Sequence, residues 1–231
     1  SDAQTGTVVG FGGIIRRTLT GGETWFQLPI ETGAQLTAVR FVDALIGTVV
    51  DVEGAAHSTM SAGDTWVSRS IGSGAPLLGA DYFDPRTATI VGASGAIFRT
   101  EDGGGEWTDQ SGWTTNDLYA VSSTGEDAAV AVGDLGTVLF TNDGGETWIQ
   151  ADAGTTENLR GVDFDNETGI AVGFAGTALV TFDGGKTWSP SFSGTTQHLL
   201  AVTIEGDFAY AVGQNGTILR GVIRRDSGAP R

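Results

Sequence analysis

The chain has 231 residues, of which 39% are hydrophobic and 17% are charged, and this is enough for one sizeable folded domain. Its 12 Lys and Arg residues against 28 Asp and Glu residues give a net charge of −16, which disfavours nucleic acids and anionic membrane surfaces as partners. The absence of cysteine excludes disulfides, thiol nucleophiles and cysteine metal ligands, and no apolar run approaches the roughly 20 residues of a membrane-spanning helix.

In chain order, the sequence predicts repeated units of about 41 residues, each with four short strands joined by turns. The first strand of a unit has the pattern L-x-A-V-x-F, which begins at Leu36, Leu78, Leu118, Leu159 and Leu199. The second has the pattern V-G-x-x-G, which begins at Val9, Val50, Val91, Val132, Val172 and Val212. A third strand follows, as in AIFRT and TVLFT, and no segment shows the pattern of an amphipathic helix. We therefore expect an all-β protein.

Each unit then closes with a polar turn that ends in tryptophan, after which a fourth strand begins. The five copies of this turn occupy residues 18–25, 59–66, 100–107, 141–148 and 181–188. The tryptophans, spaced by 41, 41, 41 and 40 residues, are Trp25, Trp66, Trp107, Trp148 and Trp188. Paired glycines allow positive φ, and the Asp at the third position of three copies (Asp102, Asp143, Asp183) is predicted to accept backbone hydrogen bonds. The indoles, above all the last three, are predicted to be buried between neighbouring units.

The turn resembles the Asp-box, also called the BNR repeat, S/T-x-D-x-G-x-T-W, although Thr20 and Ser61 replace the Asp and Glu106 replaces the Thr before Trp. As a whole, the repeat A-V-G-x-x-G-T-I-L-x-T-x-D-G-G-x-T-W resembles the photosystem II assembly and stability factors of the Ycf48 type. This resemblance implies a β-propeller of four-stranded blades. In cyanobacteria and plants such proteins bind a photosystem reaction-centre subunit at the thylakoid membrane, so the resemblance also implies a protein partner.

The number of blades depends on how the ends of the chain are counted. The second and third strands occur six times, whereas the first and fourth occur five times, and the sixth box has decayed to GVIRRDSG at 221–228. We expect a single propeller domain over residues 1–231 with six blades, two of them incomplete. A five-bladed ring with overhanging ends, or part of a larger ring, remains the alternative.

Enzymatic and metal-binding functions are disfavoured by the residues that such sites need. Asp-boxes also occur in sialidases, but their F/Y-R-I-P motif is missing, because Phe26–Ile30 reads FQLPI. No repeat-breaking pair of carboxylates stands out for glycoside hydrolysis. His57 and His198 have no metal-ligand spacing around them and are predicted to be surface or loop residues. No metal and no other cofactor is predicted.

The candidate binding residues lie where the repeat is broken on one face of the propeller. On this loop face we expect the loops from strand four to strand one and the V-G-x-x-G turns. Trp113 is the only tryptophan outside the box register and is a candidate binding residue; it is either an interface anchor or carbohydrate-stacking residue exposed in its loop, or a lid packed on its own blade. Phe11 and Phe174 occupy V-G-x-x-G turns on the same face. One inner-strand position, predicted to give the central funnel a polar lining, varies as Arg40, Tyr82, Ser122, Asp163 and Thr203.

These features together predict a non-enzymatic binding or assembly scaffold that presents its loop face to a protein or peptide partner. The net negative charge favours a cationic partner. We expect an exported protein (periplasmic, extracellular or in the thylakoid lumen) whose leader, absent from SDAQTGTV, has been removed or never existed. A binding module cut from a longer surface protein, a carbohydrate-binding module and a sialidase-like glycosidase are the alternatives.

Overall fold

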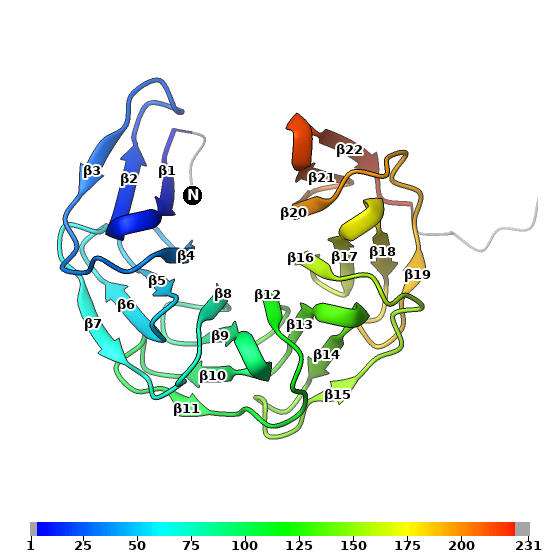
Figure 1. The fold of residues 1–231 in the computed structure, drawn as a ribbon, viewed down its shortest axis with the longest axis horizontal. Coiled ribbons are helices and arrows are strands. Elements are labelled where there is room, and N and C mark those ends of the chain that lie inside the picture. Colours follow the sequence, from blue (N-terminus) through cyan, green and yellow to red (C-terminus); the bar gives the residue numbers. More distant parts are fainter. Residues whose placement is uncertain (1–3, 225–231) are drawn as a thin grey trace, which may run out of the picture. The chain divides into compact units, whose positions relative to one another are not determined.

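The computed structural model describes residues 4–224, which form short strands joined by tight turns and single turns of 3-10 helix (Figure 1). No α-helix occurs in this part of the chain, so the predicted all-β class is confirmed. None of the helical turns there has the length and apolar character to cross a bilayer. The chain divides into two compact units, residues 1–126 and residues 127–231. The single domain expected over 1–231 remains a prediction.

The first unit consists of antiparallel sheets whose strands follow one another in sequence order. The first sheet contains β1 (Gly6–Gly10), β2 (Ile14–Thr18) and β3 (Phe26–Leu28). The second contains β4 (Leu36–Phe41), β5 (Gly47–Asp51), β6 (Ala55–Thr59) and β7 (Val67–Ser70). The third contains β8 (Leu77–Tyr82), β9 (Ala88–Gly92), β10 (Ile97–Thr100) and β11 (Thr108–Asp109). The unit ends with β12 (Leu118–Ser123), which packs beside β8.

The second unit repeats the same pattern. It begins with β13 (Ala129–Gly133), β14 (Val138–Thr141) and β15 (Ile149–Gln150). These are followed by β16 (Leu159–Asp165), β17 (Thr168–Gly173), β18 (Ala178–Thr181) and β19 (Ser189–Pro190). The last sheet contains β20 (Leu199–Glu205), β21 (Phe208–Gly213) and β22 (Ile218–Val222). Over residues 4–224 the predicted strand counts are therefore confirmed, whereas residues 225–228, half of the decayed sixth box, lie outside the described residues.

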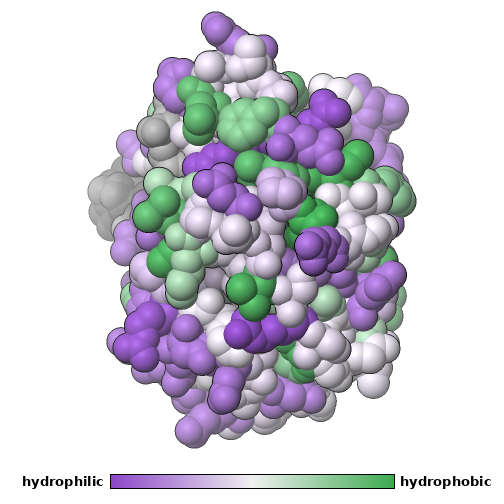
Figure 2. Space-filling view, turned by 90° about the vertical axis from the view of Figure 1, so that its left-hand side faces the viewer, coloured by the Kyte–Doolittle hydropathy of each residue, from purple (hydrophilic) through white to green (hydrophobic). Residues whose placement is uncertain are grey.

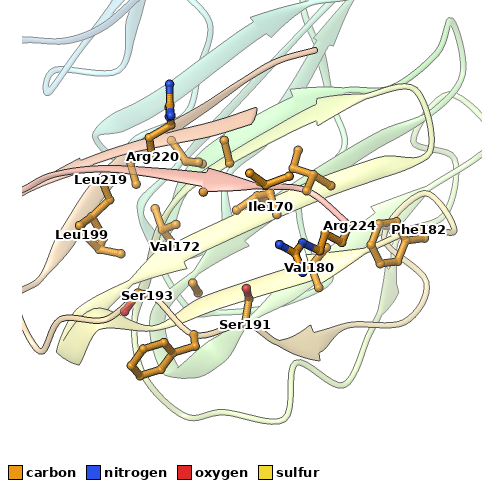
Figure 3. A pocket seen from close by; sticks show the side chains of 18 residues that line it. Ile170, Val172, Val180, Phe182, Ser191, Ser193, Leu199, Leu219, Arg220 and Arg224 are labelled. Carbon is orange, nitrogen blue, oxygen red and sulfur yellow. The ribbon is translucent and has the colours of Figure 1, made fainter. Parts of the chain in front are cut away.

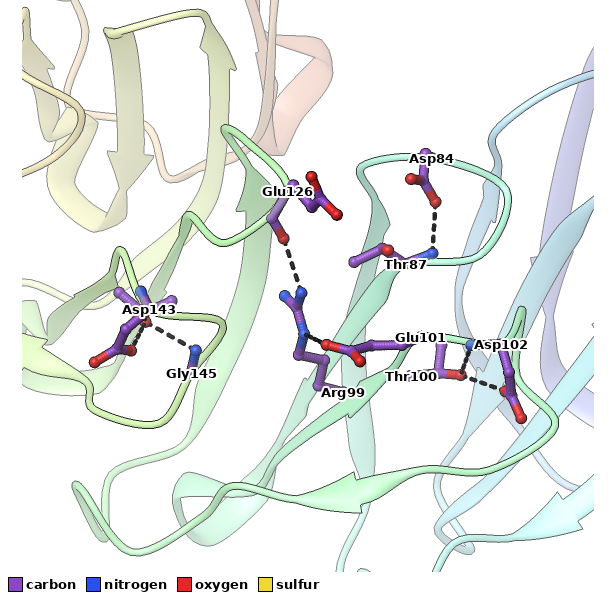
Figure 4. A network of polar contacts seen from close by, with 10 residues as sticks. Asp84, Thr87, Arg99, Thr100, Glu101, Asp102, Glu126, Asp143 and Gly145 are labelled. Carbon is purple, nitrogen blue, oxygen red and sulfur yellow. Dashed lines mark hydrogen bonds and ion pairs between the residues drawn. The ribbon is translucent and has the colours of Figure 1, made fainter.

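The box turns are held together by two side chains that accept backbone hydrogen bonds. In the copy at 141–148, the Thr141 hydroxyl accepts a bond from the Gly145 N–H at 3.0 Å and donates to the Asp143 carboxylate at 2.8 Å. The carboxylate in turn accepts from the Thr147 N–H at 3.0 Å. Figure 4 draws the hydrogen bonds at Asp143 and Gly145, and also the bond from the Thr100 hydroxyl to Asp102 in the preceding copy. The predicted role of the Asp as a backbone acceptor is confirmed.

The two copies without Asp keep the same connection through a hydroxyl group. Thr20 accepts a hydrogen bond from the Thr24 N–H, and Ser61 accepts one from the Thr65 N–H, both at 3.0 Å. A hydroxyl oxygen in this position reaches the same N–H as the carboxylate does elsewhere. The turn therefore survives a change from a charged to a neutral acceptor.

Tryptophans at the ends of the box turns fill the space between neighbouring sheets. Trp107 packs against a cluster that joins Val50 of β5 to Ile90 and Phe98 of the following sheet. Trp148 and Trp188 are buried, with 4% and 9% of their surface exposed, as the sequence predicts. Trp107 and Trp66 are only partly buried, and Trp25 is 40% exposed, so the indoles are not equally enclosed.

The register of one first strand differs from the sequence prediction. Leu36 pairs with Asp51 and Leu77 pairs with Gly92, so the structural equivalent of Leu36 is Leu77 and not Leu78. Leu77 is fully buried, like the leucines that begin the other first strands. Hydrophobic burial thus selects one of two adjacent leucines, which the repeat pattern alone did not distinguish.

Replacing Trp148 by alanine is expected to destabilise the protein by about 3–5 kcal/mol, because a buried indole is lost and a cavity is left. Urea unfolding measures this change. Trp25→Ala is the matched control, since that indole is 40% exposed and much less buried area is lost there. A Trp148→Ala cost below about 1 kcal/mol would contradict the assigned packing.

Acid is expected to weaken the box turn through Asp143. Hydrogen bonds from the Thr147 hydroxyl, the Thr147 N–H and the Thr141 hydroxyl lower the pKa of Asp143 from 3.8 to about 2. The folded pKa lies below the unfolded one, so the stabilisation is present above pH 3.8 and is lost as the pH falls towards 2. An NMR titration of the carboxyl carbon tests this value. Thr147→Val removes the strongest donor and is expected to raise the pKa towards 3.8, whereas an unchanged midpoint would be inconsistent with the assigned cause.

Candidate functional site

The loop face is assembled from the helical turn after each second strand and the loop before the next first strand. Backbone N–H groups in three turns, at Ser94, Leu135 and Ala175, each donate to the side chain 23 residues later. The acceptors, at 2.8–3.0 Å, are Asp117, Asn158 and His198. In both units the V-G-x-x-G turns therefore lie next to the loops that lead to the following first strand, as predicted.

Glycine at the end of the V-G-x-x-G motif is required by this close approach. At Gly136 the backbone has φ of 67°, and a Cβ atom would lie 2.0 Å from the carbonyl oxygen of Thr155. Such a distance is far inside van der Waals contact, and the conformation is unfavourable for residues with a Cβ. The loops are thus fixed by backbone contacts, which leaves the side chains between these contacts free to vary.

In the first unit, two of the predicted aromatic residues reach the surface. Phe11 lies in the helical turn at Phe11–Gly13 and is 73% exposed. Trp113 lies in the loop between β11 and β12 and is 42% exposed. No aromatic contact joins the two side chains within residues 4–126. In the space-filling view, hydrophobic residues are interspersed with hydrophilic ones and form no single continuous patch on the face shown (Figure 2).

In the second unit, Phe174 forms part of a stack that the sequence did not predict. Its ring lies over the imidazole of His198, with centroids 4.2 Å apart and an interplanar angle of 21°. The guanidinium carbon of Arg160 lies 5.6 Å from the centroid of the Phe174 ring. The signal in the sequence is the position of His198 immediately before Leu199, where Asp117 precedes Leu118 in an earlier repeat.

Phe174 belongs to the second unit, whereas Phe11 and Trp113 belong to the first. A patch formed by all three aromatic residues therefore remains a prediction, as does the anchor role of Trp113. Its exposure is compatible with that role.

The predicted polar inner-strand position links neighbouring first strands. Arg40 on β4 forms an ion pair with Asp81 on β8, with 2.6 Å between Nε and Oδ1. Asp81 also accepts a hydrogen bond from the Ser123 N–H on β12 at 2.7 Å. In the second unit, the Asp163 carboxylate on β16 likewise accepts from the Ile204 N–H on β20 at 2.7 Å. These carboxylates connect first strands of adjacent sheets, so at Asp81 and Asp163 the inner-strand residue stabilises the fold.

Tyr82 does not occupy this inner-strand position, because the register places Asp81 there and makes Tyr82 the equivalent of Phe41. The tyrosine is only 6% exposed, and its hydroxyl lies 2.6 Å from the Thr48 hydroxyl on β5. Burial raises the pKa of Tyr82. The ring packs inside the first unit and is not available on the predicted polar lining.

His57 is also placed differently from the prediction, whereas His198 lies in a loop as expected. His57 is on β6 with 2% of its surface exposed, and its ring nitrogens contact Ser68 Oγ at 2.7 Å and Asp51 Oδ2 at 3.0 Å. Asp51 stands where the V-G-x-x-G pattern has glycine, so the paired departure at 51 and 57 is the signal that could have revealed this contact. Among the described residues, no three His, Asp or Glu side chains gather as metal ligands would.

A central segment of the chain is similar to a known protein family. Residues 105–190 match the family described as photosynthesis system II assembly factor YCF48. No curated protein matches the sequence.

Among solved structures, YCF48 from Cyanidioschyzon merolae is 17% identical with a TM-score of 0.73, covering 93% of this chain and 78% of that chain. A structure described as YCF48 bound to D1 peptide is 18% identical with a TM-score of 0.53, covering 96% of this chain and 90% of that one. The structure of U3-55K is 10% identical with a TM-score of 0.74, covering 92% and 71%.

Because these identities are low, the structural matches establish the fold alone. The local family match adds the Asp-box repeat at 105–190 to this result. The predicted resemblance to a Ycf48-type propeller is thereby confirmed.

Proposed function

We propose that this protein is a non-enzymatic binding or assembly scaffold whose loop face holds a protein or peptide partner. The observation that carries the proposal is the exposed Trp113, which departs from the repeat and lies in a loop fixed by the Asp117 contact to the turn at Ser94. An exposed indole on a rigid support is a typical binding anchor. The similar structure described as YCF48 bound to D1 peptide supports a peptide as the class of partner.

A hydrolytic function is disfavoured because several arginines and carboxylates that could serve it are committed to the scaffold. Arg17 donates to the carbonyl oxygens of Ala62 and Ala44, and Arg99 donates to that of Glu126 at 2.8 Å (Figure 4). The Asp residues of the box turns accept backbone hydrogen bonds. A sialidase-like site needs three arginines that converge on a substrate carboxylate, and arginines held by backbone carbonyls do not offer this.

The finer features of the proposal follow from the fold and the charge. Over residues 4–224 the second and third strands of the repeat each occur six times and the first and fourth each occur five times, which supports six propeller blades of which two are incomplete. The net charge of −16 favours a cationic segment in the partner and speeds its association at low ionic strength. Export to the periplasm, the extracellular space or the thylakoid lumen agrees with the resemblance to Ycf48-type proteins.

Trp113→Ala is expected to weaken binding of a cationic peptide by at least roughly tenfold while leaving the melting temperature nearly unchanged. Fluorescence anisotropy with libraries of cationic, neutral and acidic peptides, at low and at high salt, measures the effect. Trp25→Ala is the matched control, because that indole is 40% exposed, close to the 42% of Trp113, and lies in a box turn. Equal loss of binding in both variants would contradict the anchor role, and selective binding on a glycan array would favour the carbohydrate-binding alternative.

No hydrolysis of sialosides or aryl glycosides is expected, since the arginine triad and its motif are missing from the sequence. Release of a fluorogenic aglycone measures this activity. Turnover that persists after repurification and is abolished by one Asp or Glu substitution would overturn the non-enzymatic proposal.

A further inference from the structure

A groove of about 390 Å³ opens in the second unit between the sheet that contains β17 and β18 and the last sheet (Figure 3). Most of the residues that line it are apolar, and its central side chains are Val172, Ala178, Leu199, Ala211 and Leu219. Phe182 and Phe192 border it, with 41% and 96% of their surface exposed. Arg220 and Arg224 also line the groove, in a protein whose net charge is strongly negative.

The repeat explains why this space is open. Between the second and third sheets, Trp107 packs against the corresponding cluster, whose members include Val50, Ala56, Leu77, Ile90 and Phe98. The strand registers make the central groove residues the equivalents of those five. No tryptophan follows Trp188 in the sequence, and residues 225–231, RDSGAPR, contain no aromatic residue. The groove is therefore a tryptophan-binding space without its tryptophan.

A strand edge borders the same groove. In the third sheet, Phe98 and Arg99 of β10 pair with Asp109 and Thr108 of the fourth strand. Their equivalents on β22 are Leu219 and Arg220, and β22 pairs only with β21 within the described residues. An open edge of this kind offers backbone N–H and C=O groups to an additional strand.

We propose that the groove and the edge of β22 bind an extended peptide from a partner protein, which adds as the fourth strand of the last sheet. Such strand addition takes its affinity from backbone hydrogen bonds and its specificity from side-chain pockets. An aromatic residue of the peptide enters the groove as Trp107 enters the cluster between the second and third sheets.

The charge of the edge selects the residue that follows the aromatic one. In the third sheet, Thr108 directly follows Trp107 and lies opposite Arg99. The residue after the aromatic one in a bound peptide therefore lies opposite Arg220, whose guanidinium carbon is 4.8 Å from the Phe208 ring centroid. An acidic residue there pairs favourably across the strands. The recognised segment is thus an extended peptide with an aromatic residue followed by Asp or Glu, a chemistry distinct from the cationic partner proposed for the loop face.

The test uses the full chain and a fluorescein-labelled peptide with the sequence of residues 143–150, DGGETWIQ, in which Ile149→Glu places a carboxylate after the tryptophan. Anisotropy is expected to show saturable binding that weakens by roughly tenfold or more when the peptide carries Trp148→Ala. Absence of saturable binding, or equal binding of the two peptides, overturns the proposal.

Charge reversal separates specific pairing from general attraction. The Arg220→Glu variant of the protein is expected to bind the acidic peptide more weakly. The same variant is expected to regain binding with a peptide that carries Ile149→Lys in place of Ile149→Glu. Arg16→Glu is the matched control, because Arg16 is an exposed arginine on β2, a strand that is paired on both edges. The control is expected to leave the preference for the acidic peptide intact, and identical effects of the two protein variants overturn the proposal.

Other occupants of the groove give different results. If a second copy of this chain occupied the groove, sedimentation would show a dimer that dissociates when the peptide is added. If residues 225–231 occupied it, their deletion would make the peptide bind more tightly. Either result overturns a partner peptide as the occupant. Trp113→Ala leaves groove binding unchanged, so a failure of this site and a failure of the loop face are distinguishable.

Discussion

The packing of neighbouring sheets depends on the hydrogen bonds that close the box turns. A turn between two short strands leaves backbone N–H groups without strand partners. The Thr and Asp side chains of the box accept hydrogen bonds from these N–H groups. With the turn closed, the residue that follows is held at a fixed place between two sheets, and that residue is tryptophan. The local hydrogen bonds of the box turn thus position a tryptophan that packs between two neighbouring repeats, which are about 41 residues apart in sequence. Replacement of the Asp by Thr20 or Ser61 preserves the turn, because only an acceptor oxygen is needed, and in the Ser61 copy Trp66 still packs against the core cluster of Ile15, Leu28, Leu36 and Val49.

At the other end of the strands, the V-G-x-x-G turns are also held by side chains that accept backbone hydrogen bonds, but several residue types can serve as the acceptor. In each of three loops, one side chain accepts a hydrogen bond from a backbone N–H of the adjacent turn. This acceptor is the carboxylate of Asp117, the amide oxygen of Asn158 or the imidazole of His198. Because the backbone is fixed by this bond and by the close approach at glycine, the remaining loop side chains do not have to stabilise the fold. Trp113 and the Phe174–His198 stack occur in these loops. Binding residues can change there at little cost in stability.

Charged residues inside the sheets mainly connect neighbouring strands. The Arg40–Asp81 pair and the bond from the Ser123 N–H join three successive first strands, and the His57–Asp51 pair joins β6 to the end of β5. The acidic surplus of the chain therefore does not by itself identify a catalytic site. What distinguishes this molecule from a uniform repeat is the set of places where the repeat is broken, namely the exposed Trp113 and the groove without a tryptophan.

The sequence by itself determined the strand types, their order and their numbers, because each strand and each box turn depends on residues within a few positions of one another. It also identified the Asp side chains as backbone acceptors and the last two box tryptophans as buried. Contacts between distant residues decided the rest. Two adjacent leucines satisfied the pattern at 77 and 78, and only burial against the next sheet showed that Asp81 and not Tyr82 faces Arg40. The burial of His57, the stack on Phe174 and the groove beside β22 likewise depend on which sheets meet, and this is a property of the tertiary structure.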